Sequence, residues 1–349
     1  MKARRIVAWP VGDAHNASTR YRLLAHLPAF AEAGFDTEVR YPLSLGRTGP
    51  LRRYWRLRDL WRDASNVRRP GELLFVQRKT YPPFFAGRLP GCGRPIVFDM
   101  DDALYLPPPG FASAERYRRN FDATVQVADL VLVGSRELAT QLPHERHELL
   151  PTPVDTERFA PERHAPATGP VAGWVGYSGN LPYLEALAEP LLEVARRHEG
   201  FRLIVVADRE PRLPGIEVEF RRWSLETEVS CFDGIGVGLM PLDDTPWARG
   251  KCAFKAIQYM ALGIPCVVSP VGANRDLVIH GENGFLADGA GEWVEALDAL
   301  LSPGGLARRI GAAGRQTVLC SYSLDVVSRR LVDLLLKICP RSRAGPAVR

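Results

Sequence analysis

Hydrophobic runs alternate with helix-like segments along both halves of the chain. In the first half, the runs typical of buried strands are residues 5–10, 36–42, 72–78, 95–100 and 128–135. In the second half they are residues 171–180, 201–208, 231–241 and 265–270, with a helical pattern from Leu181 to His198. Strands that alternate with helices predict a parallel sheet with crossover helices, the α/β class, and the pattern occurs twice.

A proline-rich segment separates the two halves. The sequence therefore predicts four parts: a domain over 1–152, a linker over 153–170, a second domain over 171–321 and a terminal part over 322–349. This last part begins with a strongly apolar helix and ends with a tail.

Two of the five lysines lie four residues apart in one apparent helix. Lys251 and Lys255 fall in its predicted first turn, with Gly250 at its start and Gly263 and Pro265 at its end. Like charges at this spacing repel each other, and cations at a helix N-terminus oppose the macrodipole. The arrangement indicates an anion such as phosphate between the two ammonium groups. A solvated basic face is the alternative.

Three linked motifs follow these lysines. Residues 258–267 are QYMALGIPCV, residues 271–276 are VGANRD, and residues 281–284 form a GENG turn ahead of Phe285 and Leu286. In order and spacing they resemble the group-1 (family 4-like) retaining glycosyltransferases of the GT-B fold. That family has E-Y-M-A-x-G-x-P-V-V, then a V-G-G-x-x-E-like loop, then G-x-x-G-x-L. Residues 152–161 also keep the V-D and F-x-P parts of its N-G-V-D-x-x-x-F-x-P segment.

The resemblance implies two Rossmann-like doubly wound domains facing a cleft. It also implies transfer of a sugar from a nucleotide-diphosphate sugar to a glycan or lipid-linked acceptor, with retention, without a metal and without a cofactor. Surface polysaccharide or glycoconjugate biosynthesis is the expected role. Lys251 and Lys255 would then be catalytic, as fixed cations that stabilise the departing diphosphate. In GT-B proteins the last helix commonly packs on the first domain, and we expect the same for 322–349.

The donor-binding residues that the resemblance implies follow three strands of the second half. They are Gly176, Tyr177, Ser178, Gly179, Gln258, Gly272, Asn274 and Arg275. Asn274 and Arg275 would face the donor sugar, or they simply start a helix.

The chain departs from the family in two ways. The Arg that many members carry in the first turn of this domain, and the Lys shortly after it, are missing. The E-x7-E pair is replaced by Gly250 and Gln258. We hypothesise that Lys251 and Lys255 supply the missing cations. A non-catalytic sugar-nucleotide-binding protein is the main alternative, and an epimerase is a further one.

The loop after the first strand, residues 12–21, is expected to face the acceptor and the donor phosphates. It contains Gly12 and enters a helix that we predict to be capped by Ser18 or Thr19. Arg20 is the candidate anion contact, with an ordinary surface arginine as the alternative.

An acidic cluster ends the strand at 95–100. Asp99, Asp101 and Asp102 fit a metal-binding D-x-D or the first motif of haloacid-dehalogenase-like phosphatases, in which Asp99 would be the nucleophile. The pattern of two repeated units argues against a metal-binding D-x-D site. The order of the later motifs argues against a phosphatase. At the carboxyl edge of a parallel sheet these carboxylates are better placed to bind sugar or acceptor hydroxyls. Asp101 or Asp102 assists deprotonation of the acceptor, or the cluster is structural.

Charge is unevenly distributed along the chain. Residues 1–160 hold 24 basic and 18 acidic side chains, whereas the remainder holds 21 and 22. The segment 47–69 contains eight arginines beside tyrosine and tryptophan, which is typical of a helix that contacts anionic lipid headgroups. The alternative is a helix that covers the first sheet. No base-reading motif accompanies these charges, so we expect no nucleic-acid partner.

Cysteine and histidine spacing predicts neither a disulfide framework nor a metal site. The six cysteines form no C-x-x-C pair, and the seven histidines have no ligand spacing. There is no apolar run of about 18 residues, and the run from Ile6 to Val11 is too short for a signal peptide. We expect a cytoplasmic protein, with peripheral contact at the inner face of the membrane.

Overall fold

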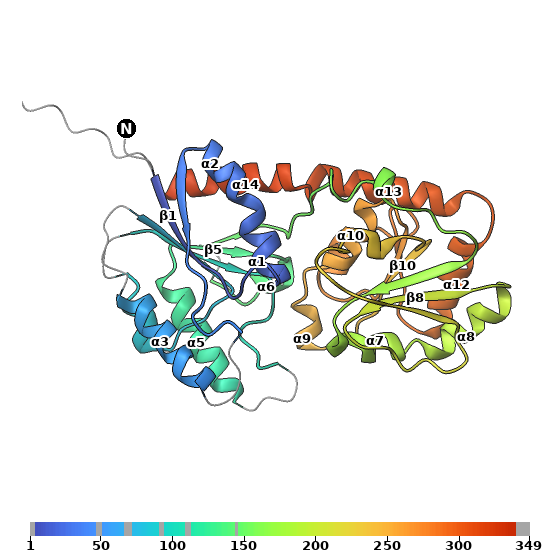
Figure 1. Ribbon diagram of the computed structural model, residues 1–349, viewed down its shortest axis with the longest axis horizontal. Coiled ribbons are helices and arrows are strands. Elements are labelled where there is room, and N and C mark those ends of the chain that lie inside the picture. Colours follow the sequence, from blue (N-terminus) through green and yellow to red (C-terminus); the bar gives the residue numbers. More distant parts are fainter. Residues whose placement is uncertain are drawn as a thin grey trace, which may run out of the picture. The chain divides into compact units, whose positions relative to one another are not determined.

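The structure is a computed structural model that describes residues 4–46, 51–65, 72–90, 94–108, 113–143 and 146–339 (Figure 1). The chain divides into two compact units. The first unit comprises Met1–Thr152 and Val327–Arg349, and the second comprises Pro153–Val326. Each unit contains one six-stranded parallel sheet, which confirms the α/β class.

The sheet of the first unit has the order β2-β1-β3-β4-β5-β6. Its strands are β1 (Arg4–Trp9), β2 (Phe35–Val39), β3 (Glu72–Gln77), β4 (Ile96–Met100), β5 (Leu130–Val133) and β6 (His147–Leu149). The five predicted strands of this half are confirmed. The short strand β6 was not predicted, because three half-buried residues carry no periodic signal.

Helical segments of very different lengths accompany this sheet. They are α1 (Ala17–Arg22), η1 (Leu24–His26), α2 (Leu27–Glu32), α3 (Leu51–Ser65), α4 (Pro83–Ala86), α5 (Ala114–Val127), α6 (Arg136–Ala139) and α14 (Leu324–Ile338). Helix α14, red in Figure 1, brings Val327, Leu331 and Leu335 into the same core as Ile6 and Phe75. The end of the chain therefore completes the core of the first unit.

The sheet of the second unit has the order β12-β11-β10-β7-β8-β9. Its strands are β7 (Val171–Val175), β8 (Arg202–Ala207), β9 (Val218–Arg222), β10 (Val237–Met240), β11 (Cys266–Val268) and β12 (Phe285–Leu286). The four predicted strands are confirmed as β7, β8, β10 and β11. Strand β9 was missed because it is a half-exposed edge with two arginines, and β12 has only two residues.

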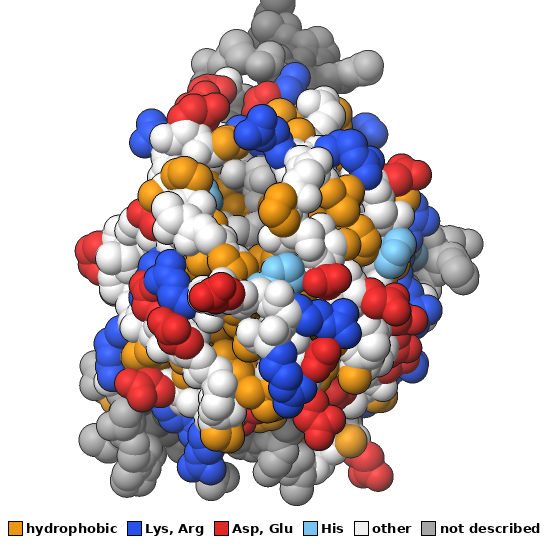
Figure 2. All heavy atoms as spheres, turned by 90° about the vertical axis from the view of Figure 1, so that its right-hand side faces the viewer, with side chains coloured by type: hydrophobic (Ala, Val, Ile, Leu, Met, Phe, Trp, Pro, Cys, Tyr) orange, Lys and Arg blue, Asp and Glu red, His pale blue; other side chains and the backbone are white. Residues whose placement is uncertain are grey.

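Apolar side chains cover both faces of this second sheet and form two separate core clusters. The helical segments that supply them or lie beside them are η3 (Pro161–Arg163), η4 (Ser178–Asn180), α7 (Leu181–Glu185), α8 (Ala188–Arg197), η5 (Ser230–Phe232), α9 (Pro246–Arg249), α10 (Phe254–Ala261), α11 (Ala273–Leu277), α12 (Ala290–Leu301) and α13 (Leu306–Ser321). The single helix predicted from Leu181 to His198 is thus two helices, α7 and α8. Figure 2 shows acidic and basic side chains interspersed on the face that it draws.

Each sheet has a point at which the strand order reverses. In the first unit β1 lies between β2 and β3, so the reversal falls between β1 and β3. In the second unit β7 lies between β10 and β8, so it falls between β7 and β10. Ligands of doubly wound proteins bind outside the carboxyl ends of the strands at this point. Among the described residues, no helix has the length and apolar character that a membrane span requires.

Candidate donor site and the polar cluster of the first unit

The predicted donor residues follow three neighbouring strands of the second sheet. Gly176–Gly179 follow β7, the lysine segment lies between β10 and α10, and Gly272–Arg275 follow β11. Strands β7, β10 and β11 are adjacent and parallel, so their carboxyl ends share one edge. The structure therefore brings these residues to the edge at which the strand order reverses, the ordinary ligand position of this fold.

The predicted start of the lysine helix is wrong. Gly250 caps the end of α9, and α10 begins only at Phe254, after Ala253 in the left-handed conformation with φ of 53°. Lys251 therefore lies in the loop before the helix, and Lys255 is the second helical residue. The predicted i, i+4 repulsion on one helix does not apply, because the two lysines are not in the same helix.

Lys255 and Gln258 lie together. The Lys255 Nζ donates a hydrogen bond of 2.9 Å to the Gln258 Oε1. One residue later, the Tyr259 side chain is fully buried, and its hydroxyl accepts a 3.0 Å hydrogen bond from the Val175 N–H at the end of β7. This contact fixes helix α10 on the sheet, so the position of Lys255 is set by a rigid element.

Gly272 holds two loops of the candidate site against each other. Its backbone has φ of 53° and ψ of −131°, which side chains rarely adopt. A Cβ placed here would lie 2.3 Å from the backbone oxygen of Arg249, the last residue of α9. Only glycine lets the β11–α11 loop approach the segment that leads to Lys251.

Asn274 and Arg275 contact their own loop. Asn274 is 1% exposed, and its Nδ2 donates a 2.9 Å hydrogen bond to the Ser269 oxygen. Its Oδ1 is buried without a hydrogen-bond partner in the structure. The exposed Arg275 donates from its Nε to the Pro270 oxygen. Both side chains thus stabilise the turn.

Two N–H groups of the turn after β7 donate hydrogen bonds to other groups of the protein. Gly176 donates to the Val206 oxygen at 3.0 Å, and Ser178 donates from its N–H and its hydroxyl to the Asp208 carboxylate, each at 2.7 Å. In this structure these two N–H groups are therefore not aimed at a phosphate. Gly176 packs so closely on Trp174 that a Cβ would lie 2.3 Å from its ring. Tyr177 is 68% exposed.

In the first unit, Asn16 caps α1, so the predicted cap at Ser18 or Thr19 is wrong. The Asn16 side chain accepts the Thr19 N–H at 3.1 Å. Gly12 packs on Asn16, whose Cβ would lie 2.8 Å from an added Cβ. Arg20 donates to the Ala14 oxygen at 2.8 Å, which holds the loop after β1 to the helix.

Asp99 is paired with Arg22 in the core of the first unit. Both side chains are almost completely buried, and three hydrogen bonds of 2.5–3.0 Å join the guanidinium to the carboxylate. The Arg22 Nη1 also donates to the Leu150 oxygen and the Thr152 hydroxyl. Burial raises the pKa of Asp99, and the Arg22 charge opposes that rise. A buried Asp99 paired with Arg22 does not fit the accessible nucleophile that the phosphatase alternative requires.

Asp101 and Asp102 form a polar cluster with Ser18 and Arg78 at the carboxyl edge of the first sheet. Ser18 donates to Asp101, and Arg78 donates to Asp102 and, at 2.7 Å, to the Ser18 hydroxyl. Arg78 directly follows β3 and has φ of 53°. The sequence analysis missed Arg78, although its place after a buried strand was a usable signal.

Helix α3 turns acidic residues inward and aromatic residues outward. Asp59 and Asp63 are buried, whereas Tyr54, Leu57 and Trp61 are 52%, 49% and 54% exposed. These three side chains therefore do not pack in the core of the first unit. Residues 47–50 and 66–69 of the predicted lipid-contact segment lie outside the described residues.

Within the described ranges, no three His, Cys, Asp or Glu side chains are grouped so as to hold a metal ion. The described cysteines, residues 231, 252, 266, 320 and 339, are all free thiols.

Comparison with known proteins gives a family match and a set of similar structures. Residues 170–303 match the family model of the Glycosyl transferases group 1. No curated protein sequence matches the chain. Sucrose-phosphate synthase from Thermosynechococcus elongatus is 16% identical, with a TM-score of 0.70 over 97% of this chain and 100% of that one.

Two further structures cover the full length. A glycosyltransferase from Rickettsia africae is 13% identical, with a TM-score of 0.71 over 98% of this chain and 100% of that one. The Anabaena protein HepE in complex with UDP and glucose is 13% identical, with a TM-score of 0.68 over 96% and 100%. The chain has the GT-B fold of two Rossmann-like doubly wound units, and residues 170–303 within it match the group-1 glycosyltransferase model.

Proposed function

We propose that the protein is a retaining glycosyltransferase that uses a nucleotide-diphosphate sugar without a metal or other cofactor. The observation that carries the proposal is the group-1 domain over residues 170–303, which contains the lysine segment at the strand-order reversal of the second sheet. The acceptor would be a glycan or a lipid-linked glycan of a surface polysaccharide or glycoconjugate. The similar HepE structure is a complex with UDP and glucose, so a UDP-hexose is the first donor to test.

In this proposal Lys251 and Lys255 stabilise the diphosphate as the bond to the sugar breaks. Negative charge develops on the leaving group at that moment, and fixed cations favour the transition state over the ground state. Gln258 accepts a hydrogen bond from Lys255 and carries no charge, so it orients the ammonium group without neutralising it. A glutamate in its place would cancel part of that attraction, and Gln258→Glu is therefore expected to weaken nucleotide binding.

Calorimetric titration with UDP, GDP, ADP and dTDP in the absence of metal tests the donor site. The proposal expects one nucleotide to bind and Lys251→Ala/Lys255→Ala to lose at least about 100-fold in affinity, since each charged hydrogen bond contributes about 1.5–3 kcal/mol. Lys337→Ala, a lysine of α14, is the matched control and should bind as the parent protein does. Absence of binding by every nucleotide would refute the donor site.

Turnover separates the proposed enzyme from its main alternative. A protein that binds a nucleotide sugar but transfers and hydrolyses nothing across donors and acceptors would be a sugar-nucleotide-binding protein. The neutral Gln258 and the absence of a side chain at Gly250 are what favour that alternative.

On the acceptor side, we assign Asp101 and Asp102 to the acceptor hydroxyls, with one of them assisting deprotonation. Their connection to Ser18 and Arg78 gives both carboxylates a fixed orientation at the sheet edge. Asp102→Asn should lower kcat at least about 100-fold, the lower end of the range of about 10²–10⁴ that general base catalysis contributes. Unchanged turnover would make the role of Asp102 structural.

We further propose a cytoplasmic enzyme that contacts the inner face of the membrane through the exposed side of α3. Tyr54, Leu57 and Trp61 are joined there by Phe84 of α4, and the Trp61 and Phe84 rings lie 6.5 Å apart. The Arg88 guanidinium lies 4.1 Å from the Phe84 ring centre, so cations and aromatic rings share one surface, as in interfacial anchors.

Flotation with vesicles that contain phosphatidylserine tests this contact. Trp61→Ala/Phe84→Ala should reduce the bound fraction several-fold, whereas Ile279→Ala, which removes a side chain that is 56% exposed in the second unit, should not. Equal flotation of all three proteins, or none by any, would refute the membrane contact.

A further inference from the structure

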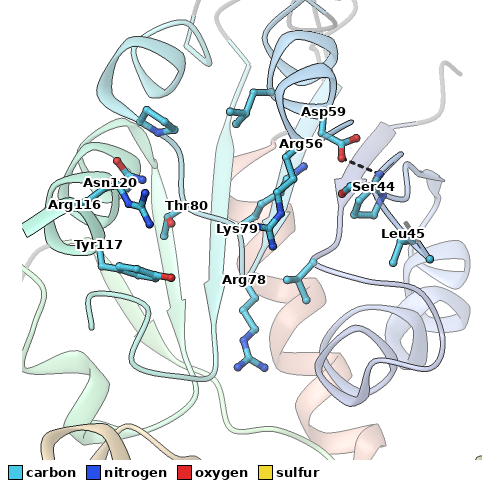
Figure 3. A pocket seen from close by; sticks show the side chains of 15 residues that line it. Ser44, Leu45, Arg56, Asp59, Arg78, Lys79, Thr80, Arg116, Tyr117 and Asn120 are labelled. Carbon is cyan, nitrogen blue, oxygen red and sulfur yellow. Dashed lines mark hydrogen bonds between the residues drawn. The ribbon is translucent and has the colours of Figure 1, made fainter. Parts of the chain in front are cut away.

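A pocket of about 790 Å³ lies at the carboxyl edge of the first sheet. Its floor is formed by Arg78, Lys79 and Thr80, which follow β3, and by Val11, which follows β1. It therefore occupies the strand-order reversal of the first unit, where doubly wound sheets bind their ligands. The walls come from α3 and α5, and Figure 3 shows Arg56 and Arg116 extending from these two sides.

Two cations of this pocket are already paired with buried or half-buried carboxylates. Lys79 contacts Asp63, which has only 1% of its side chain exposed, and Arg78 contacts Asp102. These pairs make a rigid floor. Asp59, the one acidic residue in the described lining, accepts the N–H groups of Leu43 and Ser44 at 2.7 and 3.1 Å. The loop after β2 therefore stabilises the Asp59 carboxylate by hydrogen bonds.

Arg56 and Arg116, the other two cations in the described lining of the pocket, differ from Arg78 and Lys79 in their contacts. Within the part of the chain that the structure describes, no carboxylate pairs with either side chain, and both residues are exposed. They belong to separate helices on opposite sides of the pocket (Figure 3). Thr80 and Asn120 add neutral hydrogen-bonding groups to the pocket lining. Two guanidinium groups that face one space repel each other unless an anion lies between them.

We infer that this pocket binds a phosphate or diphosphate group of the acceptor, with Arg56 and Arg116 as its ligands. A guanidinium donates two parallel hydrogen bonds to phosphate oxygens, and a group with three or more such oxygens can accept from both sides at once. The inference rests on the proposed function, because it names the acceptor class: a glycan that carries a phosphate, or a lipid diphosphate that carries a glycan.

Pyrophosphate titration of the full-length protein tests the site. The measurement is made in the Lys251→Ala/Lys255→Ala background, so that the donor site does not contribute. Arg56→Ala/Arg116→Ala should weaken pyrophosphate binding at least tenfold. Arg58→Ala/Arg119→Ala removes two arginines from the same two helices outside the pocket lining, and should stay within about twofold. Equal losses in both variants, or no binding by any protein, would overturn the inference.

Competition identifies the source of the phosphate. Displacement of pyrophosphate by a short-chain polyprenyl diphosphate supports a lipid-linked acceptor, and displacement by a hexose phosphate supports a phosphorylated glycan. Displacement by neither would overturn the acceptor assignment. The same Arg56→Ala/Arg116→Ala substitution in the parent protein must leave nucleotide binding unchanged. Normal nucleotide binding without pyrophosphate binding that depends on Arg56 and Arg116 would refute the phosphate pocket and leave the donor site intact. Arginine-dependent pyrophosphate binding without nucleotide binding would refute the donor site and leave the pocket intact.

Discussion

Gly272→Ala should damage the candidate donor site as well as the stability of the fold. An alanine at φ of 53° and ψ of −131° costs about 1–3 kcal/mol, since this region is almost restricted to glycine. Its Cβ would also lie 2.3 Å from the Arg249 oxygen, whereas real Cβ contacts stay above 3.0 Å. The backbone must therefore move by at least the difference, 0.7 Å. Arg249 precedes Lys251 by two residues, so this movement displaces the lysine segment.

A displacement of about 1 Å in a binding constellation costs up to roughly 100-fold. Calorimetry on Gly272→Ala should accordingly show nucleotide binding weakened at least tenfold, while urea unfolding shows a free energy loss of about 2–4 kcal/mol. Gly281→Ala is the matched control: its φ is +76°, but no heavy atom lies within 4 Å of the added Cβ. It should lose about 1–2 kcal/mol and bind nucleotide normally. The reasoning fails if Gly272→Ala binds like the parent protein, or if both variants weaken binding equally.

Three further predictions concern buried polar groups. Asp99→Asn should lower the free energy of unfolding by about 3–5 kcal/mol in urea titration, because it leaves the buried Arg22 charge without its partner; a loss below about 1 kcal/mol would contradict this. Tyr259→Phe should cost about 1–3 kcal/mol by removing the acceptor of the Val175 N–H, and an undiminished urea midpoint would show that water replaces it. Burial, aided by the Arg22 charge, lowers the pKa of His26 to about 3. In the unfolded chain His26 binds a proton below about pH 6.5, whereas in the folded protein it stays neutral down to about pH 3. The free energy of unfolding should therefore fall by about 1.4 kcal/mol for each pH unit below 6.5. His26→Gln should flatten this pH dependence in urea titrations.

The strands at both strand-order reversals were predictable because they are continuous apolar runs. β1 and β3 in the first unit, and β7 and β10 in the second, are buried along most or all of their length, which leaves a signal in any single sequence. The structure confirms the fold from these elements, whereas β9, an edge strand, carried too weak a pattern.

The errors arose where a local conformation overrides the residue pattern. The lysine helix begins four residues later than predicted, because Ala253 takes a left-handed conformation that no alanine signals in advance. The cap of α1 falls on Asn16 because the loop after β1 is short and closes on itself through Gly12. Helix spacing alone cannot specify either start.

Long-range pairs were beyond the reach of the sequence. Arg22 and Asp99 lie 77 residues apart, and nothing in a single chain indicates that one guanidinium will join α1, β4 and the end of the first unit. Asp99 fitted the phosphatase motif because the motif was visible in the sequence and its partner Arg22 was not. The same limitation hid Arg78, whose role depends on Ser18 and Asp102 meeting at one edge.

Backbone strain marks both candidate sites independently of the sequence motifs. Among the described residues, three non-glycine residues have positive φ: Arg78, Ser113 and Ala253. Two of them adjoin the strand-order reversals, Arg78 immediately after β3 and Ala253 in the lysine segment after β10. A strained conformation persists only where surrounding contacts impose it, and such positions concentrate at functional sites.

Named cations of the two candidate sites make different contacts. In the first unit, carboxylates pair with Arg78 and Lys79, so the charges of the floor are largely cancelled before any ligand arrives. In the second unit, the Lys255 ammonium group donates a hydrogen bond to the neutral amide oxygen of Gln258. A leaving diphosphate that gains charge during the reaction is stabilised best by a cation that is oriented but not neutralised. An acceptor requires positioning more than charge stabilisation, and fixed ion pairs provide that. We therefore expect Gln258→Glu to lower kcat as well as donor affinity, and a variant that lowers only the affinity would show that Lys255 binds the donor equally in the ground and transition states.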